Sequence, residues 1–351
     1  MGNCEIDTNN AEQGAKQAET VTDNTSDTLI PDVALNDLLP EQPSTENNVV
    51  KVKTTVKRAK EAIWELSKVG HETFHPKDFA LLFGQNEKND DDRELYSVLT
   101  HEKKNVVTFM SISWDAGKLP SLQRLTGFDE AVYNAVGSLY YSDNKYITSN
   151  MIYQTFTGNK EQKQNPTKEM LNAIWDSVKR MSLIRLDIDA TQEVKAKLNI
   201  RAEYSGNLLA TEMSRVEING AVRDCIKMLA APILFRYADA KNQIARANIK
   251  MLDVPLSKTP ENITLTDYLA QRVLMAKSKK GDVGNTILYD TLYKHLGLEE
   301  AGYTEQGLRH KKKDIRSATK KILEHWKCKG EIKGYEEVLE GRTIVKIKIL
   351  F

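Results

Sequence analysis

The chain has 351 residues, of which 40% are hydrophobic and 28% are charged, and its formal net charge at pH 7 is +1. This profile is typical of a globular protein with enough apolar material for two or three domains. No segment approaches the ~18 consecutive apolar residues of a membrane span, and the first residues lack the pattern of a secretory leader. The three cysteines are far apart, which excludes a Cys-rich metal cluster, so we expect a soluble cytoplasmic protein.

Charge is distributed unevenly along the chain. Residues 1–50 hold ten acidic residues against one basic residue, whereas residues 271–351 hold 18 Lys and Arg against 11 Asp and Glu. An acidic beginning and a basic end predict a nucleic-acid contact near the C-terminus. A solvated charged face is the alternative interpretation, and charge alone does not separate the two.

Two segments precede the first predicted domain. Residues 1–48 are polar, acidic and without sustained periodicity, which predicts a disordered acidic tail. Residues 49–103 are expected to form a helical or irregular lead-in. The helical spacing in this lead-in comes from Val56, Ala59, Ile63 and Leu66.

The lead-in contains a segment that matches the H-E-x-x-H pattern of zinc proteases, His71-Glu72-Thr73-Phe74-His75. That chemistry needs both histidines on one face of a continuous helix, and the flanking Gly70 and Pro76 disfavour that helix. The chain also has no phosphate-binding G-x-x-x-x-G-K-[ST] loop and no His-x-His pair. We therefore expect no enzymatic activity, no metal and no cofactor.

Residues 104–245 are predicted to form the first of two similar domains. The expected elements are a strand at 104–113, a helix at 128–139, a short helix capped by Thr148, a longer helix opened by Asn165 and Pro166, and a strand at 184–188. A charged wing around 195–197 and return strands within 200–219 are expected to complete this domain.

Residues 246–351 are predicted to repeat this order. The expected elements are a helix at 264–278, a second helix from Asn285 to Gly297, a third at 307–328, a Glu-rich turn at 336–341 and a strand at 342–351. A helix, a short helix, a longer helix and a β-hairpin make the winged form of the helix-turn-helix. The predicted fold class is α+β, with two tandem winged-helix domains.

The predicted helix 307–328 carries the clearest functional pattern. At ~100° per residue, its apolar stripe consists of Leu308, Ile315, Thr319, Ile322 and Trp326. A second stripe consists of Arg309, Lys313, Arg316 and Lys320, with further donors at His310, Lys311 and Lys312. A helix in the DNA major groove needs both faces, because one packs on its own domain while the other meets bases and phosphates. A solvated amphipathic helix would have interspersed acids, yet residues 306–330 contain only Asp314 and Glu324.

The third helix of the first domain is less basic. It carries Lys168, Asn172, Lys179 and Arg180, but also Glu169 and Asp176. We expect this helix either to contact phosphates or to serve as a docking or dimer surface, and the sequence leaves both open.

A set of short motifs is distributed over residues 105–351. They are Phe128-Asp129-x-x-Val132-Tyr133-x-Ala135-Val136, Ile147-Thr148-x-x-x-Ile152-Tyr153, Ile174-x-x-Ser177-Val178-x-x-Met181, Asn207-Leu208-Leu209, Pro232-Ile233-Leu234-Phe235-x-Tyr237-Ala238, Asp267-Tyr268-Leu269-x-x-Arg272-Val273, Ile287-Leu288-Tyr289-Asp290, Ile322-Leu323-x-x-Trp326 and Ile332-Lys333-Gly334-Tyr335. In this pattern the chain resembles the replication initiators of theta-replicating iteron plasmids and related phage-like elements, which consist of two tandem winged-helix domains.

The resemblance implies binding of double-stranded DNA at the direct repeats of a replication origin, and recruitment of host initiator and helicase proteins. It implies that the helix from Arg309 to Lys320 reads bases, that Arg342, Lys346 and Lys348 flank the wing, and that the chain forms a homodimer or a monomer–dimer equilibrium. A transcriptional repressor that binds an operator, its own included, is the alternative function. A partition or structural adaptor is a third, and no membrane partner is expected.

Overall fold

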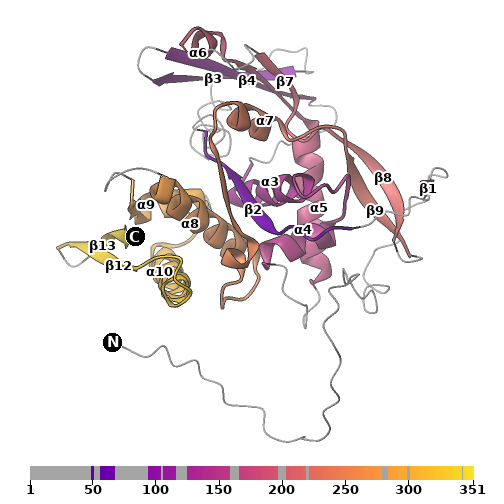
Figure 1. Cartoon of the computed structure of the whole chain (residues 1–351). Coiled ribbons are helices and arrows are strands. Elements are labelled where there is room, and N and C mark those ends of the chain that lie inside the picture. The colour runs from indigo at the N-terminus through magenta and orange to yellow at the C-terminus, as the bar shows by residue number, and fades with distance from the viewer. Residues whose placement is uncertain are drawn as a thin grey trace, which may run out of the picture.

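Figure 1 shows the computed structural model of the whole chain. The structure describes residues 49–50, 56–67, 94–103, 106–115, 125–158, 166–196, 203–218, 221–278, 284–298, 301–341 and 343–351. The predicted acidic tail and the H-E-x-x-H segment lie outside these residues. The described part combines helices with mostly antiparallel sheets, which confirms the α+β class.

The main helices begin at threonine caps. Thr126, Thr148, Thr167 and Thr304 each accept a hydrogen bond from a backbone N–H of the first turn that follows, which satisfies a donor without a partner inside the helix. The helices are α3 (Gly127–Tyr140), α4 (Ser149–Phe156), α5 (Lys168–Leu183), α6 (Thr191–Ala196), α7 (Ile233–Ala240), the 3-10 helix η1 (Ile249–Leu252), α8 (Pro260–Ser278), α9 (Tyr289–His295) and α10 (Glu305–Cys328).

In the described part of the chain the strands form four sheets. The strands are β1 (Val49–Val50), β2 (Glu61–Glu65), β3 (Glu94–Lys103), β4 (Val106–Asp115), β5 (Tyr146–Ile147), β6 (Ile184–Asp189), β7 (Glu203–Asn207), β8 (Thr211–Ile218), β9 (Ala221–Met228), β10 (Ile244–Asn248), β11 (Thr286–Leu288), β12 (Gly334–Glu340) and β13 (Thr343–Leu350). The sheets have the strand orders β1-β8-β9-β5, β10-β2, β3-β4-β6-β7 and β11-β13-β12.

Two of these sheets are built in the same way. In each, a short strand between the first and second helix of a region pairs antiparallel with the second strand of a later hairpin. In the first region Ile147 of β5 lies opposite Ile226 of β9, and in the second Ile287 of β11 lies opposite Ile347 of β13. All four isoleucine side chains are buried, so the two hairpins are anchored to their helices by equivalent contacts.

The first region departs from the expected order after α5. The strand predicted at 184–188 is confirmed as β6, but the segment predicted as a wing forms helix α6 up to Ala196. Residues 197–200 lie outside the described residues. Strands β6 and β7 extend the β3-β4 sheet, and the hairpin paired with β5 comes later, as β8 and β9. The predicted wing position was therefore wrong, because the strand that follows α5 pairs with the distant strand β4 and does not form a wing hairpin.

Three predicted boundaries also move. The cap of α5 is Thr167, not Asn165, so Pro166 precedes the helix instead of opening it. Asn285 does not cap α9, because strand β11 intervenes and the helix starts at Tyr289. The Glu-rich segment that was predicted as a turn is mostly strand β12, and the chain reverses only after Glu340.

The helical spacing of Val56, Ala59, Ile63 and Leu66 does not correspond to a helix in the described residues 56–67, so that part of the prediction was wrong. Residues 61–65 form strand β2, which pairs antiparallel with β10, and Trp64 is buried. A short, continuously apolar run is compatible with a buried strand or a buried helix, and spacing alone does not distinguish them. The domain boundary predicted at residue 245 stays a prediction, although β10 runs across that position.

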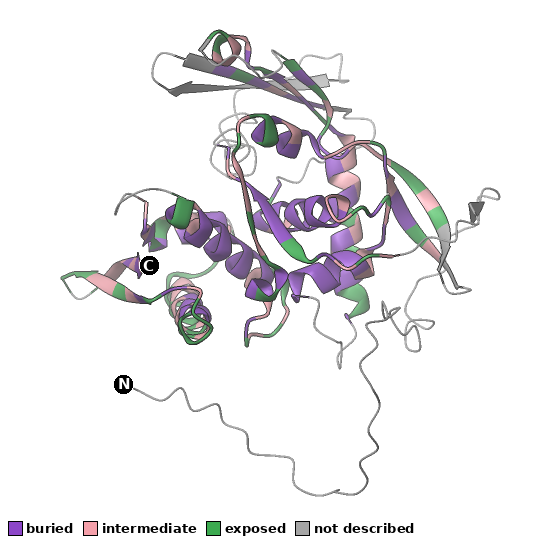
Figure 2. Cartoon of the chain, viewed as in Figure 1, coloured by how far each residue is buried: buried purple, intermediate pink, exposed green. Residues whose placement is uncertain are grey.

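Helix α3 lies at the centre of the molecule, and Figure 2 shows it buried along almost its whole length. It packs against β2, α4, α5 and α8. The buried apolar side chains of both regions form one continuous core, which runs from Ala59 to Ile349. The core therefore connects the two predicted domains directly.

Candidate nucleic-acid interface

Helix α10 has one fully buried face. Ile315, Thr319, Ile322, Leu323 and Trp326 are buried, and Leu308 of the predicted stripe is half-buried. The Trp326 indole Nε1 donates a hydrogen bond to the Met251 carbonyl of η1 at 2.9 Å. This bond satisfies the one polar atom of the buried ring and fixes the rotation of α10 about its axis. The predicted core face of this helix is confirmed.

The opposite face of α10 is exposed and basic. His310, Lys313 and Lys321 are exposed and form no ion pair or side-chain hydrogen bond with the described part of the chain. Arg309 is 77% exposed in its side chain and lies 2.5 Å from the Glu305 carboxylate one turn earlier. An exposed pair of this kind contributes little to stability and opens at little cost, so the Arg309 guanidinium remains available to a ligand.

Lys321 was not among the residues predicted from the sequence. The predicted basic stripe followed Arg309, Lys313, Arg316 and Lys320, whereas Lys313, Ser317 and Lys321 form a line of exposed residues and Arg316 and Lys320 are half-buried. The difference is a rotation of the face by part of a turn. Leu323 is buried, but the predicted apolar stripe omitted it. Including this apolar residue in the stripe would have placed the exposed face correctly.

Two predicted contact residues turn toward neighbouring helices. The Lys311 ammonium lies 2.5 Å from the Glu261 carboxylate of α8, and this hydrogen bond raises the pKa of Lys311. The Lys312 ammonium lies 4.9 Å from the centre of the Tyr293 ring of α9. These two lysines therefore lie on the sides of α10 and hold it against α8 and α9.

Two others lie against α9 and the hairpin. Arg316 is half-buried, and its Nε donates to the Lys312 carbonyl at 3.3 Å. The Lys320 ammonium lies 2.9 Å from the Glu337 carboxylate of β12, which joins the helix to the hairpin. Both cations are at the edge of the exposed face, not at its centre.

The hairpin has a mixed charge. Lys346 of β13 lies opposite Val338 of β12, Lys348 lies opposite Glu336, and both lysines are half-buried. Glu336 and Glu340 are exposed on β12. Arg342, predicted to flank the wing, lies outside the described residues.

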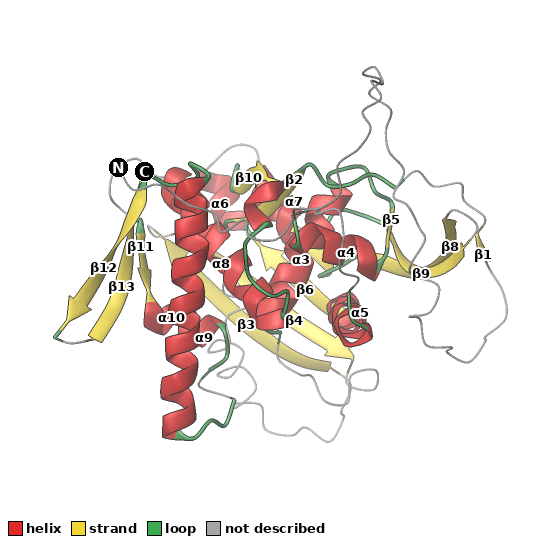
Figure 3. Cartoon of the chain, turned by 90° about the horizontal axis from the view of Figure 1, so that it is seen from below, coloured by secondary structure: helices red, strands yellow, loops and turns green. Residues whose placement is uncertain are grey.

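The first turn of α5, the less basic helix, lies on the same side of the molecule as α10. Lys168 and Asn172 are exposed, and the Lys179 ammonium lies 5.7 Å from the Trp175 ring. Figure 3 views the molecule from below, with α10 along this face and α5 seen end-on. In Figure 1 strands β4 and β7, which flank the β6 strand that follows α5, lie at the top of the molecule, so the first turn of α5 lies at the bottom.

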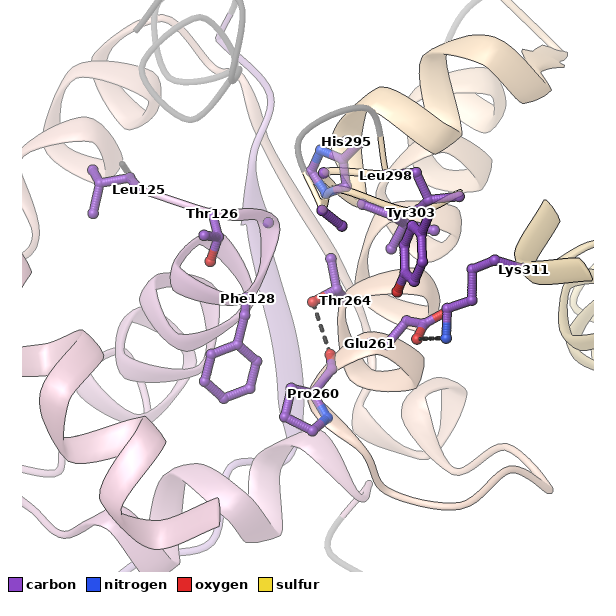
Figure 4. A pocket seen from close by; sticks show the side chains of 14 residues that line it. Leu125, Thr126, Phe128, Pro260, Glu261, Thr264, His295, Leu298, Tyr303 and Lys311 are labelled. Carbon is purple, nitrogen blue, oxygen red and sulfur yellow. Dashed lines mark hydrogen bonds and ion pairs between the residues drawn. The ribbon is translucent and has the colours of Figure 1, made fainter. Parts of the chain in front are cut away.

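A cavity of about 250 Å³ opens between the beginnings of α3 and α8, the end of α9 and the side of α10. Figure 4 shows Phe128, His295, Leu298 and Tyr303 around it, with the Glu261–Lys311 ion pair at one edge. Among the described residues, no group of His, Cys, Asp and Glu could hold a metal ion. No helix of the described part is long and apolar enough to cross a membrane.

No protein-family model matches this sequence, and no curated protein matches it. Two crystal structures are similar in shape. One, of RctB domains 2–3, is 11% identical, with 81% of this chain and 96% of that chain covered and a TM-score of 0.41. The other, of selenomethionine derivatives of domains 2 and 3 of RctB, is 12% identical, with 78% and 97% covered and a TM-score of 0.36. Likeness at this level does not establish a shared fold or function.

Proposed function

We propose that this chain is a sequence-specific double-stranded-DNA-binding protein made of two tandem winged helices, and that it is not an enzyme. The observation that carries this proposal is the exposed face of α10. There His310, Lys313 and Lys321 have no partner in the described part of the chain, while the opposite face is locked into the core by Trp326.

The sheet topology supports the winged-helix interpretation. The order α8, β11, α9, α10, β12, β13, with β11 added to the hairpin, matches a winged helix in which α10 is the recognition helix. The order α3, β5, α4, α5 with the later hairpin β8 and β9 matches it too, with β6, α6 and β7 as an insertion. Each region then presents one longer helix, α5 or α10, to solvent.

The chemistry of the α10 face fits a DNA groove. A B-DNA major groove is ~12 Å wide and admits one helix. Lysines on that helix neutralise phosphates, an arginine such as Arg309 can bind guanine O6 and N7 with two hydrogen bonds, and Ser317 can bond to any base edge. The half-buried Lys311, Lys312 and Arg316 then position the helix, and the exposed side chains make the contact.

We further propose that the target is a set of direct repeats at a replication origin, with recruitment of host initiator and helicase proteins. This finer proposal depends on the resemblance of the sequence motifs to iteron-plasmid initiators. Selection from randomised duplex DNA, followed by footprinting of the DNA around the chain's own gene, tests it. Evenly spaced direct repeats support an initiator, and a single inverted repeat over a promoter supports a repressor. No enrichment of any sequence contradicts specific DNA binding and favours an adaptor.

The contact face is tested by the double variant Lys313→Ala, Lys321→Ala. We expect weaker binding to all duplexes, and a slope of log K against log salt that is less steep by ~0.9 for each phosphate that the variant no longer neutralises. The matched control is Lys60→Ala, which removes an exposed lysine just before β2 and outside α5, α10 and the hairpins. The assignment of this face is wrong if the double variant and the control have the same affinity and salt slope as the unaltered chain.

A further inference from the structure

Three polar contacts, one between each successive pair of helices, connect α5 to α10 by way of α3 and α8. The first contact joins α5 to α3: the Arg180 guanidinium lies 2.6 Å from the Asp129 carboxylate, which is fully buried. The other oxygen of Asp129 accepts hydrogen bonds from the backbone N–H and the hydroxyl of Thr126, the N-cap of α3. A buried carboxylate with these directional partners holds α5 in one orientation on α3.

The second contact joins α3 to α8. Asp267 of α8 accepts a hydrogen bond from the Asn134 amide of α3 at 2.9 Å and another from the Trp64 indole of β2 at 2.8 Å. All three side chains are buried. One carboxylate thus uses its two oxygens to connect the two halves of the molecule, in a site where water does not compete.

Close packing also occurs at the start of α3, on one wall of the cavity described above. A Cβ on Gly127 would lie 2.6 Å from Thr264 Cγ2 and 2.8 Å from His295 Nε2, so α3 meets α8 and α9 without space for a methyl group. Interfaces packed to this density shift between discrete arrangements and do not slide continuously.

The third contact joins α8 to α10. The Glu261 carboxylate near the start of α8 lies 2.5 Å from the Lys311 ammonium, and both side chains are about one-third exposed, at 34% and 29%. Together with the bond from Trp326 to the Met251 carbonyl, this ion pair fixes α10 relative to α8 and η1.

We propose that this series of contacts sets the distance and rotation between α5 and α10, so that the chain binds two DNA segments at one fixed spacing. Asp267 is then a positioning residue for DNA recognition, and the Asp129–Arg180 and Glu261–Lys311 pairs extend its effect to the two helices. This inference rests on the proposed DNA-binding function. The partner that it specifies is a duplex with two contacted elements in a defined helical phase.

The physical basis is effective concentration. When the first helix is bound, the second meets its own element at high local concentration only if the connection between them spans the gap in the right direction. A rigid connection makes affinity sensitive to the phase of the two elements, whereas a flexible one tolerates changes in spacing. Inserting ~5 base pairs, half a helical turn, places the second element on the opposite side of the duplex.

The experiment measures binding of the full chain to duplexes in which the spacer between the two footprinted elements is lengthened one base pair at a time. For the unaltered chain we expect one optimal spacing, a loss of affinity of about tenfold at half a turn, and partial recovery at a full turn. For Asp267→Asn and Glu261→Gln we expect the spacing dependence, measured relative to each variant's own affinity for the single α10 element, to fall to about threefold or less.

Glu261→Gln keeps the inference testable if Asp267 variants fold poorly, because Glu261 is partly exposed. The matched control is Glu193→Gln in α6, which alters a polar contact with Tyr237 of α7 and with Lys241, the C-cap of α7, away from α8 and α10. A merely structural effect would lower the thermal stability of all three variants and leave the spacing profile unchanged. An unchanged spacing profile in the Asp267 and Glu261 variants would overturn the inference.

The outcomes for the unaltered chain separate the two proposals. If it binds no duplex specifically, the proposed function is wrong. If it binds its elements tightly and specifically at every spacing, the proposed function stands and the fixed connection between α5 and α10 is wrong.

Discussion

Asp267 is the residue at which burial and hydrogen bonding oppose each other most directly. Burial raises its pKa to about 6 although hydrogen bonds from Trp64 and Asn134 act in the opposite direction. Burial also raises the pKa of Glu65 to about 7, and that of Glu130 well above its ordinary value, with the neighbouring Asp267 and Glu65 charges as a further cause. Three carboxyl groups with raised pKa values therefore lie where β2, α3 and α8 meet.

These shifts predict a loss of stability as the pH rises. Each group keeps its proton in the folded chain at a pH where the unfolded chain has released it, so its contribution is complete below ~pH 4 and is lost toward pH 6 for Asp267 and pH 7 for Glu65. The amount for Asp267 is on the order of 3 kcal/mol. Asp267→Asn keeps the shape of the side chain but cannot ionise. We expect the stability of this variant, relative to that of the unaltered chain, to be greater at about pH 8 than at about pH 4. Urea unfolding at both pH values measures this, and parallel pH profiles would refute it.

At the scale of elements, the contact between α3 and the second region depends on the absence of a side chain at Gly127. Alanine normally stabilises a helix relative to glycine. Here the added Cβ would lie within 3 Å of Thr264 and of both the ring and the carbonyl of His295. The clash outweighs the helix propensity, because two of the three atoms near the added Cβ belong to the backbone and the buried ring of His295 and cannot move away easily.

We therefore expect Gly127→Ala to destabilise the fold by about 1–3 kcal/mol, the range for an overpacked core. Gly334→Ala is the control, because a Cβ there would meet only Leu350 Cδ1 at an ordinary 3.7 Å. Chemical denaturation of both variants makes the comparison. Equal stability of the two would show that α3 and α8 can separate without loss.

At the scale of the whole molecule, the core crosses the boundary that the sequence suggested between the two domains. Strand β2 pairs with β10, and the Trp64 indole reaches from β2 to α8. Because the buried apolar side chains of the described residues form one continuous core, the two regions stabilise each other.

This continuity predicts a single cooperative unfolding transition. We expect thermal melts followed by far-ultraviolet circular dichroism and by tryptophan fluorescence to coincide, since Trp64 and Trp326 report on different regions of the same core. Two separated transitions would indicate that the regions fold independently and would also weaken the case for a fixed connection between α5 and α10.

The elements that could be predicted from the sequence alone are those with a local pattern. The 3.6-residue period of α10, its stripe of Ile315, Ile322 and Trp326, and the alternation of β13 could all be predicted, because a helix or a strand of this kind repeats its own pattern along the chain. The threonine cap of α4 and the basic character of α10 were readable for the same reason. These features were enough to propose a helix-turn-helix and a DNA contact.

The remaining features depend on tertiary contacts, because the residues that pair in them are distant in sequence. Strand β2 is a strand through its pairing with β10, and the first hairpin is β8 and β9 because β4 pairs with β6. The division of the α10 cations into exposed Lys313 and Lys321 and engaged Lys311 and Lys320 follows from carboxylates on α8 and β12. Residues that lie this far apart along the chain leave no periodic signal, so their contacts become visible only when the chain is folded.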